Sequence, residues 1–330
     1  MAEFVFFLNK AVLSGLIIGS IYALGAIGLT LVFGILRFAH IAHGDVMTVG
    51  AFFTLILAGI LSSMGFVSPV PLVLVTLIPA MALTAAFSIG LDRIFYKPLR
   101  DSGAKPIIIV MASIGVMLML QGLVRIFAGT GTRNMFFDQP KDIYRIPFFG
   151  SSRDLVLTEP QTVLIVFTFA AMIALHLFLT RSRLGKAMRA VSDNADLARI
   201  TGINIDHVVK ATWIIGGGLA CAAGGLLSMD VFLKPDLSFN LLLPIFAATI
   251  VGGIGQPYGA IAGGFLVGFS ETLAIFNWSV LLRPVAHLLP FDLPASIALV
   301  PTEYKLTVPF VILIIVLVYR PTGIFKGRVL

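Results

Sequence analysis

The sequence predicts an all-α, polytopic transmembrane helical bundle, and three observations lead to this fold class. Of the 330 residues, 58% are hydrophobic and only 12% are charged, and the mean hydropathy is +1.02. Uncharged or nearly uncharged runs recur along the whole chain, and about 20 apolar residues in a helix span a bilayer. These runs lack the alternation of transmembrane β-strands, so their backbone hydrogen bonds are satisfied within helices. We expect one transmembrane domain over residues 1–330.

Seven apolar runs supply the predicted membrane segments. They are Ala11–Leu36, Val46–Leu91, Pro106–Val124, Pro160–Thr180, Ala211–Met229, Leu237–Ser270 and Leu306–Tyr319. The second run is long enough for two passes and breaks at Ser68-Pro69-Val70-Pro71, because proline removes a backbone donor and ends helices. Leu237–Ser270 divides in the same way at Gly252–Gly259, where glycine disfavours a helix. The chain therefore has nine predicted passes, or eight if one segment is re-entrant.

The first apolar run and the single cysteine exclude a signal peptide, a disulfide and a cysteine-rich metal site. The first run is too long for the core of a signal peptide and has only Lys10 as a positive flank, so we expect it to be retained as a span. The only cysteine, Cys221, lies inside an apolar run. A lone cysteine excludes an intramolecular disulfide and a cysteine-rich metal site, and we expect it to pack in the bundle.

The distribution of Lys and Arg predicts the orientation of the helices. Of the 23 positive residues, 14 lie around Arg37, in residues 93–105 and 181–210, and after Tyr319. The opposite side holds 8, including those of the loop over residues 129–159, and Arg125 is unassigned. Positive loops stay in the cytoplasm, so the N-terminus is predicted to be periplasmic and the C-terminus cytoplasmic. Because these charges sit in short loops, the net charge of +7 does not indicate a nucleic-acid partner.

The basic loop over residues 181–210 contains a predicted short helix. Ser192 or Asp193 is a candidate cap for a helix through Thr201, and Gly202 is placed to end that helix in a left-handed turn. The loop is rich in alanine, which offers a close-packing surface to another protein. An ordinary basic loop that only anchors the orientation is an equally good interpretation of the same residues.

Ionisable side chains border a membrane segment at His40, His43 and Asp45. In one interpretation they lie in headgroup water while Arg37 extends to the interface. In the other they line a translocation path or gate, because ionisable groups next to a span are costly. Their spacing lacks a further nearby ligand, so no metal site is predicted. Acid–base catalysis by these groups would need a nucleophile or a metal set, and neither accompanies them.

The apolar run Leu237–Ser270 is interrupted by the glycine-rich stretch Gly252–Gly259. Irregular backbone at membrane depth is tolerated where protein or a wet cavity buries it. Paired interruptions in the two halves of a transporter often mark the substrate site, and Gly34–Gly44 supplies the second member. Helix ends exposed there suit the carboxylate and ammonium groups of an amino acid. The glycine pairs at 15/19, 259/263 and 264/268 let helices approach closely.

These features resemble the branched-chain amino-acid permeases of the LivH type. Leu184–Ala190 and Leu197–Asn204 match that family's "LGRACRA…LGIN" pattern, although its acidic pair is replaced by residues 192–194. His40–Asp45 stands where the family has "N-F-A-H-G-[DE]", with His40 and Ile41 in place of Asn and Phe. Val251–Glu271 follows "VLGGIGSxxGAxxGGxxxGxxE", and Pro321–Phe325 is similar to "RPxGLFG".

The resemblance implies the permease subunit of an ABC importer in the cell inner membrane. Its implied partners are a second permease subunit, two cytoplasmic ATPases and a periplasmic substrate-binding protein. The chain has no G-x-x-x-x-G-K-[ST] run of its own, so ATP is used by those partners. The implied ATPase-coupling residues are Gly185, Arg189, Ala195, Ala198 and Gly202. The candidate substrate-pathway residues are His40, His43, Gly44, Asp45, Gly252, Gly253 and Gly255.

Other functions compete with this interpretation. Relatives of this type carry branched-chain amino acids, other amino acids, amides or urea, so the substrate class stays open within the family. An autonomous transporter or channel driven by an ion gradient would need charged groups deep in the bundle, and the sequence places almost none in mid-span. No cofactor is predicted.

Overall fold

The computed structural model describes residues 1–66, 71–136, 141–148, 150–284, 294 and 296–325. Ser68, Pro69 and Val70 of the predicted break lie outside the described residues. The elements are α1 (Ala2–Phe7), η1 (Leu8–Leu13), α2 (Ser14–Leu36), α3 (His43–Ser63), α4 (Leu72–Leu91), η2 (Asp92–Tyr96), α5 (Lys97–Asp101), α6 (Pro106–Ala128), β1 (Ile143–Ile146), β2 (Leu155–Thr158), α7 (Glu159–Arg181), α8 (Arg183–Asp193), α9 (Ala195–Ile200), α10 (Ile205–Asp230), α11 (Phe239–Gly252), α12 (Pro257–Ile275), α13 (Ser279–Leu282), η4 (Thr302–Tyr304) and α14 (Thr307–Tyr319).

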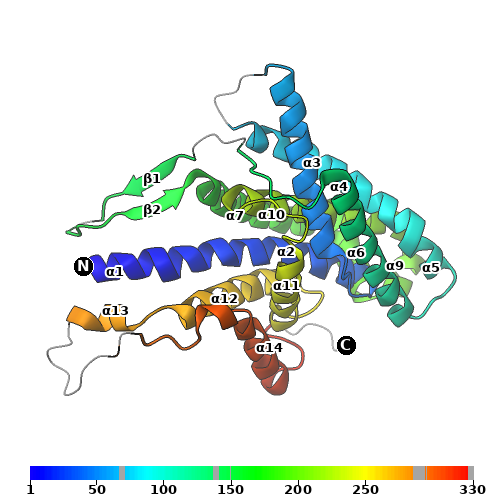
Figure 1. Cartoon of the computed structure of the whole chain (residues 1–330). Helices are drawn as coiled ribbons and strands as arrows, with labels where there is room; N and C mark the ends of the chain where they lie inside the picture. Colours follow the sequence, from blue (N-terminus) through cyan, green and yellow to red (C-terminus); the bar gives the residue numbers. More distant parts are fainter. Residues whose placement is uncertain (67–70, 137–140, 149, 285–293, 295, 326–330) are drawn as a thin grey trace.

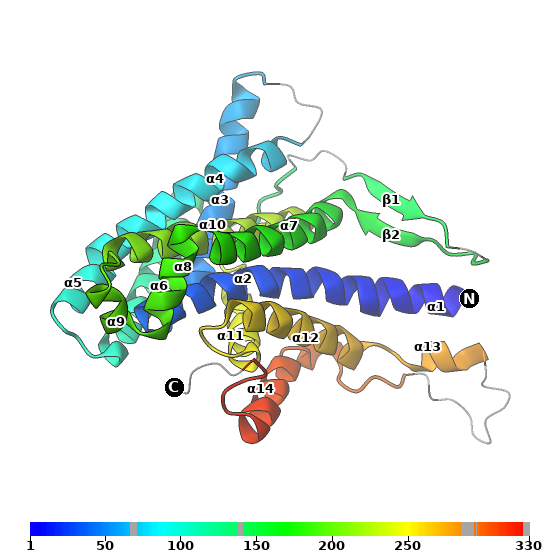
Figure 2. The same cartoon turned by 180° about the vertical axis from the view of Figure 1, so that it is seen from behind.

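The bundle has two different ends. Figure 1 shows the N-terminus, the hairpin of β1 and β2, and α13 at one end, and α5 and α9 at the other. Figure 2, from behind, places α8 beside α9 at that second end. The basic loops predicted to be cytoplasmic thus lie together, opposite the loop over residues 129–159.

Seven helical stretches in the described part of the chain are long and apolar enough to cross a membrane. They correspond to the predicted segments, which confirms an all-α membrane protein. The other two predicted passes form α11 and α14, with 14 and 13 residues. At 1.5 Å per residue each is only about 20 Å long, short of the roughly 30 Å of a hydrocarbon core. The total number of crossings therefore stays a prediction.

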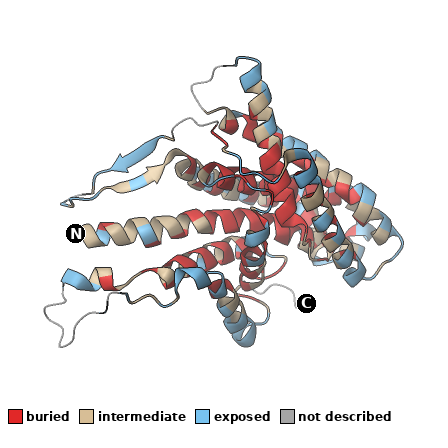
Figure 3. Ribbon diagram, viewed as in Figure 1, coloured by how far each residue is buried: buried red, intermediate tan, exposed pale blue. Residues whose placement is uncertain are grey.

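The core lies along α2, which packs most extensively against α12 and also against α10 (Figure 3). Glycines set this close approach. A Cβ added at Gly264 would lie 2.5 Å from the Ala23 nitrogen, and one at Gly268 would lie 2.5 Å from the Gly19 nitrogen. The small-residue faces predicted at 15/19 and 264/268 therefore pack within the chain. Cys221 is buried in a comparable contact against Gly50, as its predicted packing role requires.

The first helical stretch begins earlier than predicted, at Ala2 instead of Ala11. Its extra turns carry phenylalanines that pack at the N-terminal end of the bundle. The Phe7 ring centroid lies 5.2 Å from that of Phe276 and 5.9 Å from that of Trp278. These aromatic contacts pack the start of the helical stretch against the segment after α12, while Lys10 is exposed.

The loop over residues 129–159 contains the antiparallel β1–β2 hairpin, which the sequence reasoning did not predict. The hairpin docks on η1, because the Asn9 amide donates to the Asp154 carbonyl and its oxygen accepts from the Val156 nitrogen. Lys141 donates to the carbonyl of Asp230 at the end of α10. These bonds hold the described part of the loop against the bundle as a cap.

Candidate functional site

The candidate site begins where the chain reverses at the end of α2. Arg37 adopts the left-handed conformation with φ of +59°, and the following segment turns back into the bundle. A Cβ added at Gly28 would lie 2.7 Å from the His43 ring. Gly28 stands eight residues before the end of α2, so His43 lies about 12 Å inside it. Residues 38–42 are therefore a re-entrant segment.

An aromatic cluster encloses His40 within this re-entrant segment. The His40 ring is 0% exposed and packs edge-on against Tyr96 and Trp213, which stack on each other with centroids 5.6 Å apart. Its Nδ1 lies 3.2 Å from the Tyr96 hydroxyl and 3.3 Å from the Ser113 hydroxyl. His40 is thus a fully buried ring whose Nδ1 has hydrogen-bond partners on two other elements.

The next residues, His43, Gly44 and Asp45, are also buried and begin α3. Gly44 approaches the start of α11, since a Cβ there would lie 3.0 Å from the Ser238 carbonyl. Asp45 interacts with the Gln121 side chain and lies near Arg125, the residue whose side was unassigned from sequence. The interpretation that placed these groups in headgroup water is wrong, because tertiary contacts bury them.

Two consecutive helices, α8 and α9, form the predicted coupling loop. The caps differ from the prediction: Ser182 caps α8 by accepting from the Gly185 nitrogen, and Asn194 caps α9 by accepting from two backbone nitrogens. Ser192 and Asp193 belong instead to the last turn of α8. Gly202, with φ of +86°, ends the segment in the predicted left-handed turn.

The side chains of this segment divide into an inner and an outer face. Gly185 packs on the end of α7, since a Cβ there would lie 2.7 Å from the Leu179 Cα, and Ala198 is buried. Ala195 is partly buried against the core. The alanines therefore face the bundle, where the sequence reasoning had expected them to face a partner. The outer face instead presents Leu197, 61% exposed, and Ile200, 82% exposed.

The interruption between α11 and α12 lies at the same end of the molecule. Gly253 and Gly255 have φ of +113° and +81°, which glycine adopts without strain. Gly252 touches Gly259, because a Cβ there would lie 2.0 Å from the Gly259 carbonyl oxygen. The C-terminal tail pairs with this turn as the Phe325 nitrogen donates to the Gly252 carbonyl.

The two glycine interruptions meet. A Cβ at Gly34 would lie 3.6 Å from the Gly255 Cα and 3.2 Å from the Ser192 hydroxyl. The Gly255 nitrogen donates to the Thr30 hydroxyl at 3.0 Å. Arg37 donates to the Ser192 carbonyl. The end of α2, the α11–α12 turn and the last turn of α8 therefore form one joint.

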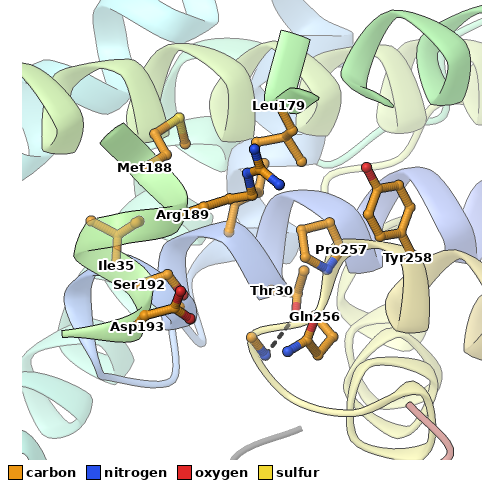
Figure 4. A pocket seen from close by; sticks show the side chains of 13 residues that line it. Thr30, Ile35, Leu179, Met188, Arg189, Ser192, Asp193, Gln256, Pro257 and Tyr258 are labelled. Atoms are coloured by element: carbon orange, nitrogen blue, oxygen red, sulfur yellow. Dashed lines mark hydrogen bonds between the residues drawn. The ribbon is translucent and has the colours of Figure 1, made fainter. Parts of the chain in front are cut away.

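A cavity of about 130 Å³ opens beside this joint (Figure 4). The α2 wall carries Leu31 and Ile35, and α8 contributes Met188, Arg189 and Asp193. Residues 255–258 at the start of α12 close the remaining side. Of the predicted residues, the structure brings together Arg189 and Gly255 at this cavity, whereas His40, His43 and Asp45 lie within the bundle.

A buried carboxylate escaped the sequence reasoning. Glu271 on α12 is 1% exposed, and its Oε2 accepts a hydrogen bond of 2.7 Å from the Tyr22 hydroxyl. Lys305 lies 3.8 Å from its Oε1. Together with Asp45, Glu271 corrects the expectation that the spans contain almost no charge. Glu271 itself was a visible signal in the sequence, because a glutamate among apolar residues of a membrane helix is costly unless it is paired.

The groups at these sites form hydrogen bonds and packing contacts between helices. Within the described ranges, no group of three or more His, Cys, Asp and Glu side chains is placed to hold a metal ion. The buried groups of the re-entrant segment contact α2, α6 and α10, while the joint contacts the exposed helices α8 and α9. Arg37 lies between the two, because it ends α2 before the re-entrant segment and its guanidinium donates to the Ser192 carbonyl of α8.

Comparison with known proteins places this architecture among transport proteins. The family model described as "Branched-chain amino acid transport system / permease component" matches residues 11–317. The chain is 33% identical over 335 residues to the high-affinity branched-chain amino acid transport system permease protein LivH of Salmonella typhimurium, covering 99% of this chain and 97% of the relative. It is 32% identical to LivH of Escherichia coli K12, with the same coverage. It is also 32% identical to BraD of Pseudomonas aeruginosa, covering 99% and 98%.

Proposed function

Because the chain belongs to the family of branched-chain amino acid transport system permease components, we propose that it is the translocating subunit of an ATP-driven importer. Its cargo is a branched-chain amino acid, as the names of its relatives state for those proteins. It works in the inner membrane with a second permease subunit, two ATPases and a substrate-binding protein. The ATPases dock at α8 and α9, which places the C-terminus in the cytoplasm and the N-terminus in the periplasm.

The observation that carries this proposal is the joint between α8, α2 and the α11–α12 turn. Leu197 and Ile200 are exposed apolar side chains on a segment with charged neighbours, and such a patch favours a protein partner. The same segment reaches the bundle through Arg37 and Ser192. Force applied to α9 by a partner is therefore transmitted to the segment that carries His40 and His43.

The re-entrant segment is the part of the pathway that this movement alters. Backbone without helical hydrogen bonds is placed deep in the bundle only where other groups bury it. Ser113 illustrates this, because its hydroxyl accepts from the Ala42 nitrogen at 3.1 Å. Moving Arg37 would loosen these contacts and change the packing of α3 against α10. We propose that α3 packs against α10 in two ways, and that these open the substrate pathway to the outside and to the inside in turn.

The experiment that tests the proposal compares Ile200→Asp with a matched control at the opposite end of the molecule. Val156 is an exposed apolar residue on β2, 45% exposed. In proteoliposomes with both permeases, the ATPases, ATP inside and the loaded binding protein outside, wild type takes up labelled leucine. We expect Ile200→Asp to lose ATPase copurification and uptake, and Val156→Asp to retain the ATPases. ATP-independent uptake by this chain alone would contradict the proposal and favour an ion-driven transporter.

A further inference from the structure

A second cavity lies between α3 and α6, away from the joint, and has a volume of about 540 Å³. Among the described residues that line it, all are aliphatic or aromatic except Arg133. Its rim is open to the surroundings of the bundle, since Ile56 on α3 is 54% exposed and Phe127 on α6 is 84% exposed. An apolar cavity with a single cation suits a ligand that joins an apolar chain to a negatively charged group.

The cavity has the depth of about one leaflet of a membrane. Both α3 and α6 are long and apolar enough to cross a bilayer. On α6 the lining runs from Leu120 to Ala128, eight residues or about 12 Å of helix. Half of a hydrocarbon core is roughly 15 Å thick. Because α6 ends at Ala128 and Arg133 follows it, the cation lies at the membrane surface and the apolar lining lies below it.

The main chain fixes the position of Arg133. Its nitrogen donates to the Leu233 carbonyl at 2.8 Å, and its carbonyl accepts from the Leu233 nitrogen at 2.9 Å. The side chain is exposed, and its Nη2 donates to the Ala128 carbonyl at 3.2 Å. Within the described ranges, no ion pair includes Arg133. A guanidinium has five N–H donors and binds phosphate through two of them at once, so Arg133 keeps donors for a phosphate group.

We infer that this cavity binds one anionic phospholipid, with an acyl chain between α3 and α6 and the phosphate on Arg133. The lipid comes from the outer leaflet, because the loop that carries Arg133 is predicted to be periplasmic. A zwitterionic headgroup adds an ammonium group, which Arg133 repels, so an anionic headgroup binds more tightly. A helix of the second permease would have to bring its own acidic residue to Arg133. A phospholipid has the chain and the charge in one molecule.

A lipid in this place extends an existing contact between the two helices. Asp45 lies one turn before Val49 on α3 and interacts with Gln121, the neighbour of Leu120 on α6. Val49 and Leu120 both line the cavity, so the acyl chain continues this contact toward the membrane surface. Occupancy therefore stabilises the arrangement of α3 and α6 seen here, because a ligand that binds only the folded state stabilises it.

Lipid affinity is the first test. The purified, delipidated transporter is titrated with phosphatidylglycerol or phosphatidylcholine, and bound lipid is counted by native mass spectrometry. Wild type should bind phosphatidylglycerol more tightly than phosphatidylcholine. Arg133→Gln should weaken phosphatidylglycerol binding by about 5-fold, the contribution of one basic residue at a lipid surface. Ile56→Trp adds volume at the rim and should weaken the binding of both lipids.

Two matched variants control for general effects of these substitutions. Arg145 on β1 and Ile126 on α6 are exposed residues that do not line the cavity. Arg145→Gln and Ile126→Trp should therefore leave both affinities unchanged. Equal phosphatidylglycerol affinity in wild type, Arg133→Gln and Ile56→Trp would overturn the inference, as would equal affinity of wild type for the two lipids.

The place of the lipid is the second test. The transporter, assembled with its second permease, is reconstituted with phosphatidylglycerol that carries a photoreactive group on one acyl chain. After illumination, peptide mapping should find adducts on residues 49–56 and 120–128, and Ile56→Trp should reduce them whereas Ile126→Trp should not. If these segments react in the isolated chain but not in the assembled transporter, the second permease fills the cavity and the inference is wrong. Adducts found only on other segments would also contradict it.

Discussion

Arg37 offers a test that separates the coupling of the importer from the stability of its fold. This residue is in the left-handed conformation, which costs a residue with a Cβ about 1–2 kcal/mol and glycine almost nothing. Its guanidinium also donates to the Ser192 carbonyl, a charge-assisted bond worth about 1.5–3 kcal/mol and less where water reaches it. In Arg37→Gly the relief of strain and the lost bond nearly cancel. The free energy of unfolding should therefore change by no more than about 1–2 kcal/mol.

The functional effect of Arg37→Gly should be much larger than its effect on stability. In the proposed mechanism, this bond links α8 to the re-entrant segment. A coupling free energy of about 1–3 kcal/mol corresponds to roughly 5- to 150-fold in the equilibrium that the ATPases shift. We expect loaded binding protein to stimulate ATP hydrolysis less by a factor in that range, and leucine uptake per ATP to fall with it.

Arg37→Ala is the matched variant, because it loses the same bond but keeps the left-handed strain. It should uncouple transport as strongly as Arg37→Gly and melt at a lower temperature in detergent. Stimulation of hydrolysis and uptake per ATP are measured in proteoliposomes for both variants. If Arg37→Gly transports leucine with the wild-type ratio to ATP, the link through Ser192 is not the coupling route. If only Arg37→Ala is impaired, the defect is one of folding.

Two further substitutions test the packing of the bundle, with thermal melting in detergent as the measurement. Gly264→Val places side-chain atoms where a Cβ already lies 2.5 Å from the Ala23 nitrogen, so we expect at least about 1–3 kcal/mol of lost stability. Gly122→Val is its control, with nothing within 4 Å of a Cβ, and equal melting of the two would contradict this packing. Tyr22→Phe removes the donor to buried Glu271 and should cost about 1–3 kcal/mol. Adding Glu271→Gln should recover part of that loss, and strictly additive effects would argue against a direct bond.

Sequence reasoning predicted the features that depend on local chemistry. The apolar runs form helices because their length and composition suit a bilayer. The interruption before Pro257 and the turn at Gly202 follow from the conformations that glycine and proline favour. These properties belong to a few neighbouring residues, so distant contacts do not change them.

The features that sequence reasoning missed depend on residues far apart in the chain. His40 is buried by Tyr96 and Trp213, which come from other helices. The residues next to His40 in the sequence do not indicate these contacts. The β1–β2 hairpin is held in place through Asn9 of η1, which lies 147 residues before its partner Val156 in the chain. The exposed pair Leu197 and Ile200 is a different case, because apolar residues three apart in a charged loop were a visible signal.

The construction of α2 connects the two ends of the importer in one rigid piece. Helix runs continuously from Ala2 to Leu36, about 52 Å at 1.5 Å per residue, and packs on α12 through glycines along its length. A helix held so closely cannot bend where it is packed, so movement at its end is confined to the joint at Gly34. There Gly34 meets Gly255 without an intervening side chain, and small relative shifts meet little resistance. The contacts of this joint, between α2, the α11–α12 turn and the last turn of α8, are therefore the ones on which the proposed coupling acts.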